Sequence, residues 1–179
     1  PIHELSQKII NKVQNRFDKD YKPRDDEGIL KRYSDITQVD MSKGNWLVLS
    51  SANYFLDDAK DLCEIQGWYY QFKGRNSIPL KLLMALNNWE AWRKDAQLNH
   101  LEIKNIYEYL GSHVLPGFQK GKTLHSDTKY LMRDCKAEHG LVTDSVWYEA
   151  FEGLDPMTET YIRNMRANGE MINIHIYFL

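Results

Sequence analysis

The sequence is poor in several features that would assign a chain to a class at once. Its 179 residues contain only two cysteines, Cys63 and Cys135, which is too few for a disulfide framework and typical of a reducing compartment. It has neither an apolar run of membrane-spanning length nor a secretory signal at its start. The net charge of −2 gives no global basic field, so any contact with nucleic acid has to be local. These absences predict a cytoplasmic protein without a membrane partner.

The length and the two ends of the chain suggest a piece of a longer polypeptide. A chain of 179 residues can form one domain, or one domain with a sizeable insertion, and is long enough to bury a hydrophobic core. It opens on Pro1 without a methionine and stops within the apolar run Ile176 to Leu179, without a turn or a polar tail. We therefore expect both boundaries to be cuts through a longer protein.

The stretch from Trp46 to Phe72 has the clearest pattern. An apolar run is followed by the polar turn Ser50 to Asn53, by apolar residues at helical spacing, and by Gly67, a residue type that favours helix ends. Asn53 is expected to cap the helix. Because ligands of parallel sheets bind at the carboxyl ends of strands, Ser50 to Asn53 is the first candidate site. The pattern predicts a strand over 46–51, a helix over 54–66 and a strand over 68–72.

The rest of the chain predicts an α/β fold that carries a helical insertion. Ser77 is expected to cap a helix over 79–95, with Pro79 in its first turn. This helix and the helix over 54–66 should pack on one mostly parallel sheet with right-handed crossovers. The other predicted elements are a helix over 2–17, an edge strand over 29–34, helices over 100–110, 143–152 and 156–167, and a last strand over 172–178. The sheet domain would then cover 1–95 plus 171–179, and 96–170 would be a helical insertion without a convincing strand.

The order of these elements resembles the second motor domain of the UvrD/Rep-type superfamily 1 DNA helicases. In that family a strand ending in Arg-Ser/Thr-Asn precedes a helix, then a strand with a Gly-containing loop, then a helix that enters a mobile helical insertion. The matching segments here are Ser51-Ala52-Asn53, Tyr70-Gln71-Phe72-Lys73-Gly74 and Leu82 to Trp92. His3 to Ile10 resembles the helix after the family's motif IV, and the terminal strand resembles the one that leads into motif V. The resemblance implies an incomplete RecA-like motor domain between these two motifs.

The same resemblance implies that the parent protein hydrolyses ATP with Mg²⁺ and steps along single-stranded DNA. The P-loop lysine, the Walker B carboxylate and the arginine that contacts the γ-phosphate belong to parts of such proteins outside this sequence. The chain alone is therefore expected to have no catalytic residue, no cofactor and no ATPase activity. Its implied partners are single-stranded DNA, bound weakly, and the remainder of the helicase polypeptide.

Asn53 is the most specific candidate residue. By resemblance it lies in a pocket that receives an unstacked base, since a side-chain amide can pair with a base edge. Its simpler role is that of a helix cap alone, and both interpretations stay open. Ser51 stands where the family has an arginine, which weakens the prediction of tight DNA binding at this turn.

Basic and aromatic residues surround this position in the predicted sheet. Lys73 and Arg75 follow the strand over 68–72, and Tyr54 comes directly after Asn53. Basic groups near aromatic rings suit single strands, because phosphates attract positive charge and bases stack on rings. Trp68 to Tyr70 are either further rings of this site or core residues of their strand.

Two further motifs lead to weaker predictions. Gly117 to Thr123 resembles a Walker A loop, but it is one residue short between its glycines and lacks a buried strand before it. We interpret it as a basic loop in which Lys120 and Lys122 could contact duplex phosphates. Cys135 and His139 have no second pair of ligands beside them, so no metal site is predicted.

Two other functions remain open. The chain could be a non-catalytic α/β module that binds a protein through aromatic residues of its helical part, namely Tyr107, Tyr109, Trp147, Tyr148 and Phe151. It could also be a small stand-alone α/β enzyme whose site has no recognisable motif. A reading frame with ATPase motifs upstream and motif V downstream would favour the helicase fragment over both.

Overall fold

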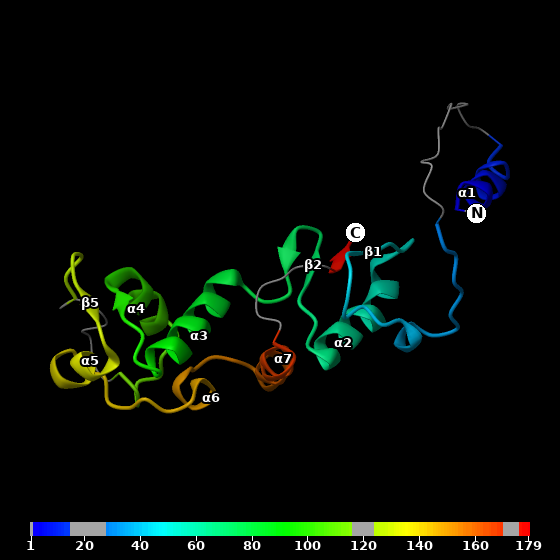
Figure 1. Ribbon diagram of the computed structural model, residues 1–179. Helices are drawn as coiled ribbons and strands as arrows, with labels where there is room; N and C mark the ends of the chain where they lie inside the picture. Colours follow the sequence, from blue (N-terminus) through cyan, green and yellow to red (C-terminus); the bar gives the residue numbers. More distant parts are fainter. Residues whose placement is uncertain (1, 15–27, 116–123, 170–175) are drawn as a thin grey trace. The chain divides into compact units, whose positions relative to one another are not determined.

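The computed structural model describes residues 2–14, 28–115, 124–169 and 176–179 (Figure 1). Its contacts divide the chain into two compact units, Pro1–Val39 and Asp40–Leu179. Among the described residues, no helix is both long and apolar enough to cross a membrane.

The first unit has no buried residue among those described. Helix α1 (Ile2–Ile10) ends earlier than the predicted helix over 2–17, of which residues 15–17 lie outside the described part. The predicted edge strand over 29–34 is wrong, because this segment pairs with no described strand and Ile29 is 80% exposed. Apolar residues alone do not make a strand without a partner ladder and a buried face. A 3₁₀ turn, η1 (Ile36–Gln38), follows, and the Asp35 side chain caps it.

The second unit contains a four-stranded sheet with the order β1-β6-β2-β3. β1 (Trp46–Val48), β6 (Ile176–Phe178) and β2 (Tyr70–Phe72) are parallel, and β3 (Arg75–Asn76) is antiparallel to β2. The prediction of a mostly parallel α/β sheet is confirmed, although the strands are shorter than expected and β3 was not predicted. Because β6 lies between β1 and β2, the chain returns to the centre of the sheet after passing through the helices.

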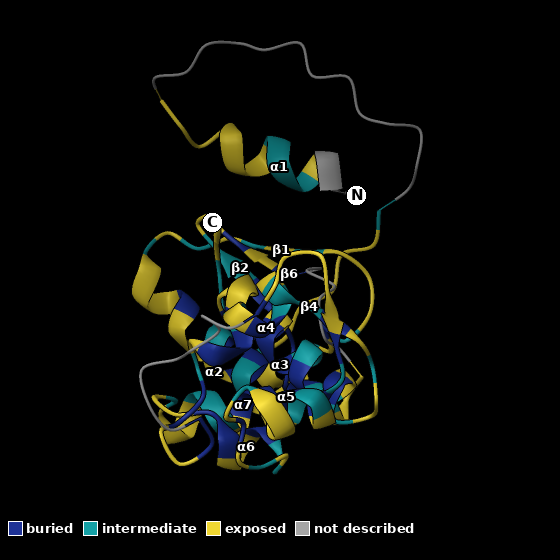
Figure 2. Cartoon of the chain, turned by 90° about the vertical axis from the view of Figure 1, so that its left-hand side faces the viewer, coloured by how far each residue is buried: buried dark blue, intermediate teal, exposed yellow. Residues whose placement is uncertain are grey.

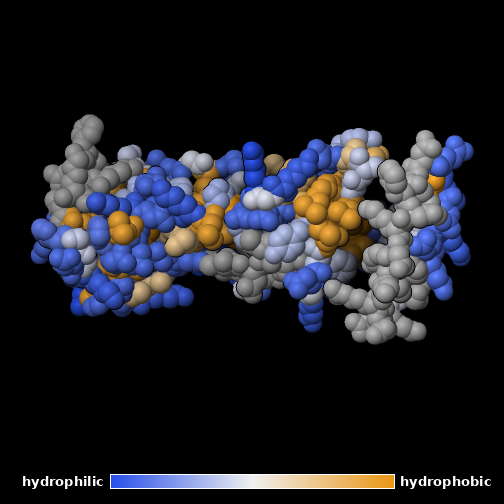
Figure 3. Space-filling model, turned by 90° about the horizontal axis from the view of Figure 1, so that it is seen from above, coloured by the Kyte–Doolittle hydropathy of each residue, from blue (hydrophilic) through white to orange (hydrophobic). Residues whose placement is uncertain are grey.

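The two faces of the sheet differ in their cover. Helix α2 (Asp57–Gln66), with α7 (Pro156–Ala167) packed against it, covers one face. There the Tyr70 hydroxyl donates to the Glu64 carboxylate at 2.8 Å, and the Tyr70 ring lies edge-on to Phe178. The opposite face presents Leu47 and Tyr177, which are 58% and 38% exposed. Figure 3 shows apolar side chains gathered in this region.

The remaining elements form a helical cluster around two tryptophans. Trp89 and Trp92 are fully buried, and their indole N–H groups donate to the carbonyls of Ser145 and Tyr130 at 3.1 and 3.0 Å. Figure 2 shows the buried residues concentrated on α3 and its neighbours. The elements of the cluster are α3 (Leu80–Trp92), α4 (His100–Tyr107), α5 (Met132–Glu138), α6 (Trp147–Ala150) and a short antiparallel pair, β4 (Leu98–Asn99) with β5 (Lys129–Tyr130).

Helix α3 differs from its prediction in two ways. We expected it to pack on the sheet, but its main contacts are with α4 and α6. Buried side chains on several sides of α3, Trp89 and Trp92 among them, account for this enclosed position. Ser77 is not its cap: Pro79 occupies the N-cap position, and the Ser77 hydroxyl is instead within 2.8 Å of the Tyr161 hydroxyl.

Candidate functional site at the carboxyl edge of the sheet

The parallel topology brings the ends of three strands together. The backbone N–H of Lys73, directly after β2, donates to the carbonyl of Phe178 at 3.0 Å, and the N–H of Leu179 donates to Val48 at 3.2 Å. The segments that follow β1, β2 and β6 therefore share one edge of the sheet, as expected for parallel strands. Lys73 lies at this carboxyl edge, and Ser51 and Asn53 belong to the segment that leaves it after β1.

Lys73 and Gly74 form the tight turn of the β2–β3 hairpin. Both residues have positive φ, 47° and 78°, and Phe72 pairs with Arg75 across the turn. Two left-handed residues between paired strands are the geometry of a type I′ turn. The predicted glycine loop is therefore a hairpin, and it holds the side chains of Lys73 and Arg75 exposed on one short structure.

An aromatic ring lies under two ammonium groups at this edge. The Nζ atoms of Lys73 and Lys60 are 5.4 and 4.8 Å from the centroid of the Phe72 ring. Such cation–π contacts stabilise by about 0.5–1 kcal/mol at exposed sites. Lys60 also pairs with the Asp57 carboxylate at 2.5 Å. The sequence-based prediction did not include Lys60. The signal that could have indicated it is that Lys60 is the only basic residue on a helix rich in acidic ones.

Asn53 does not cap a helix, so that prediction is wrong. It is the first residue of a 3₁₀ turn, η2 (Asn53–Leu56), whose N-cap position is occupied by Ala52 with no side-chain hydrogen bond. The 3₁₀ turn separates Asn53 from α2, which starts at Asp57. Both Asn53 and Ser51 are exposed in the segment that leaves the carboxyl edge. The base-contact interpretation of Asn53 therefore no longer competes with a cap.

Two aromatic residues of η2 are left outside the core. Tyr54 is 66% exposed and Phe55 is 58% exposed, and their ring centroids are 4.0 Å apart. Phe55 was not among the predicted site residues. In contrast, Trp68, Tyr69 and Tyr70 are buried, which decides for the core interpretation of that strand. Burial, together with the hydrogen bond that the Tyr70 hydroxyl donates to the Glu64 carboxylate, raises the pKa of Tyr70.

The other predicted positions contribute no described site. The Walker-like segment Gly117 to Thr123, with Lys120 and Lys122, lies outside the described residues. Within the described ranges, no group of His, Cys, Asp or Glu could hold a metal ion. Burial raises the pKa of the Cys63 thiol to about 12 and that of Cys135 to about 11, so neither is a reactive thiolate near neutral pH.

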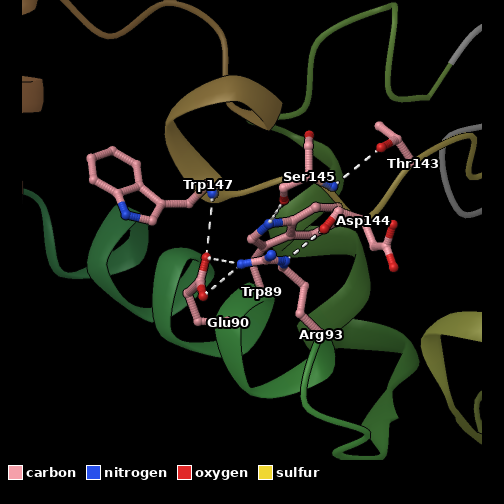
Figure 4. A network of polar contacts seen from close by, with 7 residues as sticks. All are labelled: Trp89, Glu90, Arg93, Thr143, Asp144, Ser145 and Trp147. Carbon is pink, nitrogen blue, oxygen red and sulfur yellow. Dashed lines mark hydrogen bonds and ion pairs between the residues drawn. The ribbon is translucent and has the colours of Figure 1, made fainter.

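A polar network in the helical cluster has a structural role (Figure 4). The Glu90 carboxylate pairs with the Arg93 guanidinium at 2.9 Å and accepts the backbone N–H of Trp147 at 3.3 Å. The Arg93 Nε–H donates to the Asp144 carbonyl at 2.6 Å. These contacts join α3 to the segment before α6 and satisfy the partly buried charges, which leaves no reactive group free among them.

Comparison of the chain with protein-family models, with curated proteins and with solved structures gives no match.

Proposed function

We propose that this chain is part of the second motor domain of a UvrD/Rep-type superfamily 1 DNA helicase, and that its carboxyl edge forms part of the path of single-stranded DNA. The observation that carries the proposal is the return of β6 between β1 and β2, so that the segment with Asn53 leaves the same edge of the sheet at which the Lys73–Gly74 turn lies. A RecA-like sheet interrupted by an insertion requires such a return, because the strand after the insertion has to rejoin the sheet.

The distribution of contacts supports an insertion. The main contacts join β1, β6, β2 and β3 to one another, α2 to η2 and α7, and the elements α3, α4, α6, β4 and β5 to one another. Helix α3, which belongs to the range 1–95, therefore packs with the helices of the range 96–170. We propose 1–95 plus 171–179 as the partial motor domain and 96–170 as the helical insertion. Helix α7, inside the second range, packs on α2, so the insertion would reach back to the sheet through this helix.

The chemistry of the edge suits a single strand held by few contacts. Lys73 and Arg75 supply positive charge for phosphates, and the exposed Asn53 amide can donate to and accept from a base edge. Ser51 supplies no charge where the family has arginine. With a net charge of −2, the chain has no long-range attraction for DNA to add to these contacts.

The proposal assigns ATP and Mg²⁺ to the parent protein. A titration of the isolated chain with Mg-ATP should leave its melting temperature unchanged. A ligand that binds only the folded state raises the melting temperature, and under the proposal ATP does not bind this chain. A concentration-dependent rise would contradict the assignment and point back to Gly117 to Thr123.

Fluorescence anisotropy of a labelled oligothymidylate tests the DNA contact. We expect weak binding at low salt, with log K falling by roughly 0.7 per log salt for each phosphate contacted. The double variant Lys73→Gln/Arg75→Gln should weaken binding and reduce that slope. Its control, Lys94→Gln/Lys104→Gln, removes the same charge from exposed positions of the helical cluster. Equal losses of affinity in the two double variants would show that binding depends only on net charge, which would contradict a DNA contact at Lys73 and Arg75.

A protein-binding module is the second candidate, and the open face of the sheet favours it. Besides Leu47 and Tyr177, this face and its edge expose Leu49 and Leu179, which are 67% and 58% accessible. Of the five aromatic residues suggested for such a role, Tyr107, Trp147 and Phe151 are buried in the helical cluster, Tyr109 is partly exposed, and Tyr148 is 40% exposed. A chain that binds no single strand but self-associates or captures a partner through Leu47 and Leu49 would favour this candidate.

A further inference from the structure

Side chains of α7 complete the carboxyl end of α2. The last carbonyl groups of a helix have no partner within that helix. Here the Asn164 amide donates to the Ile65 carbonyl at 2.9 Å, and the Asn168 amide donates to the Gln66 carbonyl. Asn168 does so from the first position after α7, as the C-cap of that helix. Two asparagines therefore hold the end of α7 against the end of α2.

Asn168 is also the first residue of a chemically reactive pair. It precedes Gly169, and no other Asn-Gly pair occurs in the 179 residues. Glycine has no side chain to shield its backbone nitrogen, so this nitrogen can attack the Asn168 Cγ. The new N–C bond closes a succinimide ring, the Cγ–Nδ2 bond breaks, and the amide leaves as ammonia with the proton of the Gly169 N–H. Water then opens the ring to aspartate or isoaspartate, so water is the only co-reactant.

The packed structure holds this pair in an unreactive geometry. Asn168 has helical angles, φ −81° and ψ −6°, which place the Gly169 nitrogen beside the Asn168 nitrogen and away from the Asn168 Cβ. The Gly169 N–H donates to the Arg166 carbonyl at 3.1 Å, and the Asn168 amide is held by Gln66. Both residues of the pair are exposed to water. The protection therefore comes from hydrogen bonds and backbone geometry, which opening of α7 would remove, and not from burial.

Conversion would change the contact that protects the site. A carboxylate has no proton to donate at neutral pH, so the Gln66 carbonyl would lose its donor. The new negative charge would lie beside the carboxyl end of α2, which is the negative end of the helix dipole. Isoaspartate would in addition lengthen the backbone by one methylene group at the end of α7. Because ammonia is lost, the change is irreversible.

We propose that Asn168–Gly169 is a spontaneous deamidation site that the packing of α7 on α2 protects. Local opening of α7 frees the pair to react, and the product holds α7 less firmly than asparagine does. The site therefore records openings of α7 and makes later openings more frequent. This inference is independent of the proposed DNA contact.

Incubation of the full chain in heavy-oxygen water at mildly alkaline pH tests the protection, because each conversion incorporates one heavy oxygen atom at the pair. Cleavage after Arg166 isolates the site for mass spectrometry. The chain unfolded in urea gives the rate of the unprotected pair, and the folded wild type should react at least about tenfold more slowly. Tyr161→Phe removes the hydrogen bond from α7 to the Trp68 carbonyl and should speed the reaction of the folded chain about fivefold.

Asn99→Ala is the matched control, because it removes a helix cap in the helical cluster at a similar cost in stability and leaves α7 unchanged. It should leave the reaction rate unchanged. Equal acceleration by Tyr161→Phe and Asn99→Ala would show that only global unfolding exposes the pair. An equal rate in the folded and the urea-unfolded wild type would show that α7 gives no protection. Either result overturns the proposal.

Asn168→Asp tests the consequence of the modification directly. Hydrogen exchange at the amides of Ile162 and Met165, both buried on α7, should be about fivefold faster in this variant than in the wild type. Asn168→Ala removes the donor without adding charge and should give a smaller increase. If Asn168→Asp exchanges at the wild-type rate, the modification does not weaken the packing of α7, and the proposed one-way change is refuted.

Discussion

The two ends of helix α2 have opposite surroundings. At its carboxyl end, Gly67 adopts φ 71° as the C-cap, and the backbone of α7 approaches so closely that a Cβ on Gly67 would lie 2.4 Å from the carbonyl carbon of Asn164. The Asn164 side chain donates to the Ile65 carbonyl at 2.9 Å. At its amino end, no side chain caps the helix, and Tyr54 and Phe55 are exposed.

This contrast teaches where the chain holds its fold and where it has residues available for binding. At the carboxyl end of α2, α7 packs against Gly67, which has no side chain, and forms a hydrogen bond with the Ile65 carbonyl. Substitutions at this end should therefore change stability. The amino end uses little of its side-chain chemistry for the fold, so changes there should act on binding with little effect on stability. The following substitutions test that division.

Gly67→Ala should have the largest effect. The new methyl group overlaps the backbone of Asn164 and Met165, and alanine is strained at positive φ, so we expect a loss of about 3 kcal/mol or more in urea unfolding. Gly74→Ala is the matched control, because Gly74 has φ 78° but no atom within 4 Å of its Cβ position. It should lose only about 1–2 kcal/mol from backbone strain. Equal losses in the two variants would show that α7 does not seat against Gly67.

Tyr161→Phe should have the next largest effect. The Tyr161 hydroxyl donates to the buried Trp68 carbonyl at 2.8 Å and lies 2.8 Å from the Ser77 hydroxyl, so its removal takes this donor away from the Trp68 carbonyl. We expect a loss of about 1–2 kcal/mol in the free energy of unfolding. Tyr54→Phe, at the other end of α2, removes the same atom from an exposed ring and should change stability by less than about 0.5 kcal/mol. A loss of similar size in both would remove the distinction between the two ends.

Much of the sheet could be predicted from the sequence, because its signals are local. The apolar runs at β1 and β2, the helical spacing between them and Gly67 at the helix end all act within a few residues. The packing of α7 on α2 could not be predicted in this way, since Tyr161 and Asn164 form hydrogen bonds with residues 93 and 99 positions away in the sequence. No local pattern indicates such partners.

The errors at the candidate site have equally specific causes. Asn53 is of a residue type that commonly caps helices, but one turn of 3₁₀ helix follows it, and α2 starts only at Asp57. β3 has only two residues and depends on the left-handed turn at Lys73 and Gly74, which the sequence indicates only through its glycine. Lys60 reaches the edge from a helix by way of Phe72, and that meeting exists only in three dimensions.

Alkaline pH should weaken the carboxyl half of α2 through Cys63. Burial raises the pKa of this thiol from an ordinary value near 9 to about 12, so the folded state holds the proton more firmly than the unfolded state. The protonated thiol contributes fully to the stability of the fold below the unfolded-state pKa, and this contribution is lost as the pH rises from there toward 12. About one unit above the unfolded-state value the loss is on the order of 1 kcal/mol. Unfolding of the wild type and Cys63→Ala between pH 8 and roughly 10 measures it. Parallel pH dependences would contradict the assignment.

Asn53→Ala should have the smallest effect on stability and a clear effect on binding. Because Ala52, not Asn53, occupies the N-cap position, the substitution removes no capping bond and should change the free energy of unfolding by less than about 0.5 kcal/mol. Asn99→Ala is the matched control: the Asn99 side chain accepts hydrogen bonds from the N–H groups of Leu101 and Glu102, and the loss of these bonds should cost about 1 kcal/mol.

Under the proposed function, Asn53→Ala and Asn53→Asp both weaken binding of oligothymidylate, and the aspartate does so more strongly because it places an anion beside the strand. If Asn53→Ala destabilises the fold as much as Asn99→Ala, the residue is a cap after all. If it changes neither stability nor affinity, Asn53 does not contact the strand, and the DNA contact would have to rest on Lys73 and Arg75 alone.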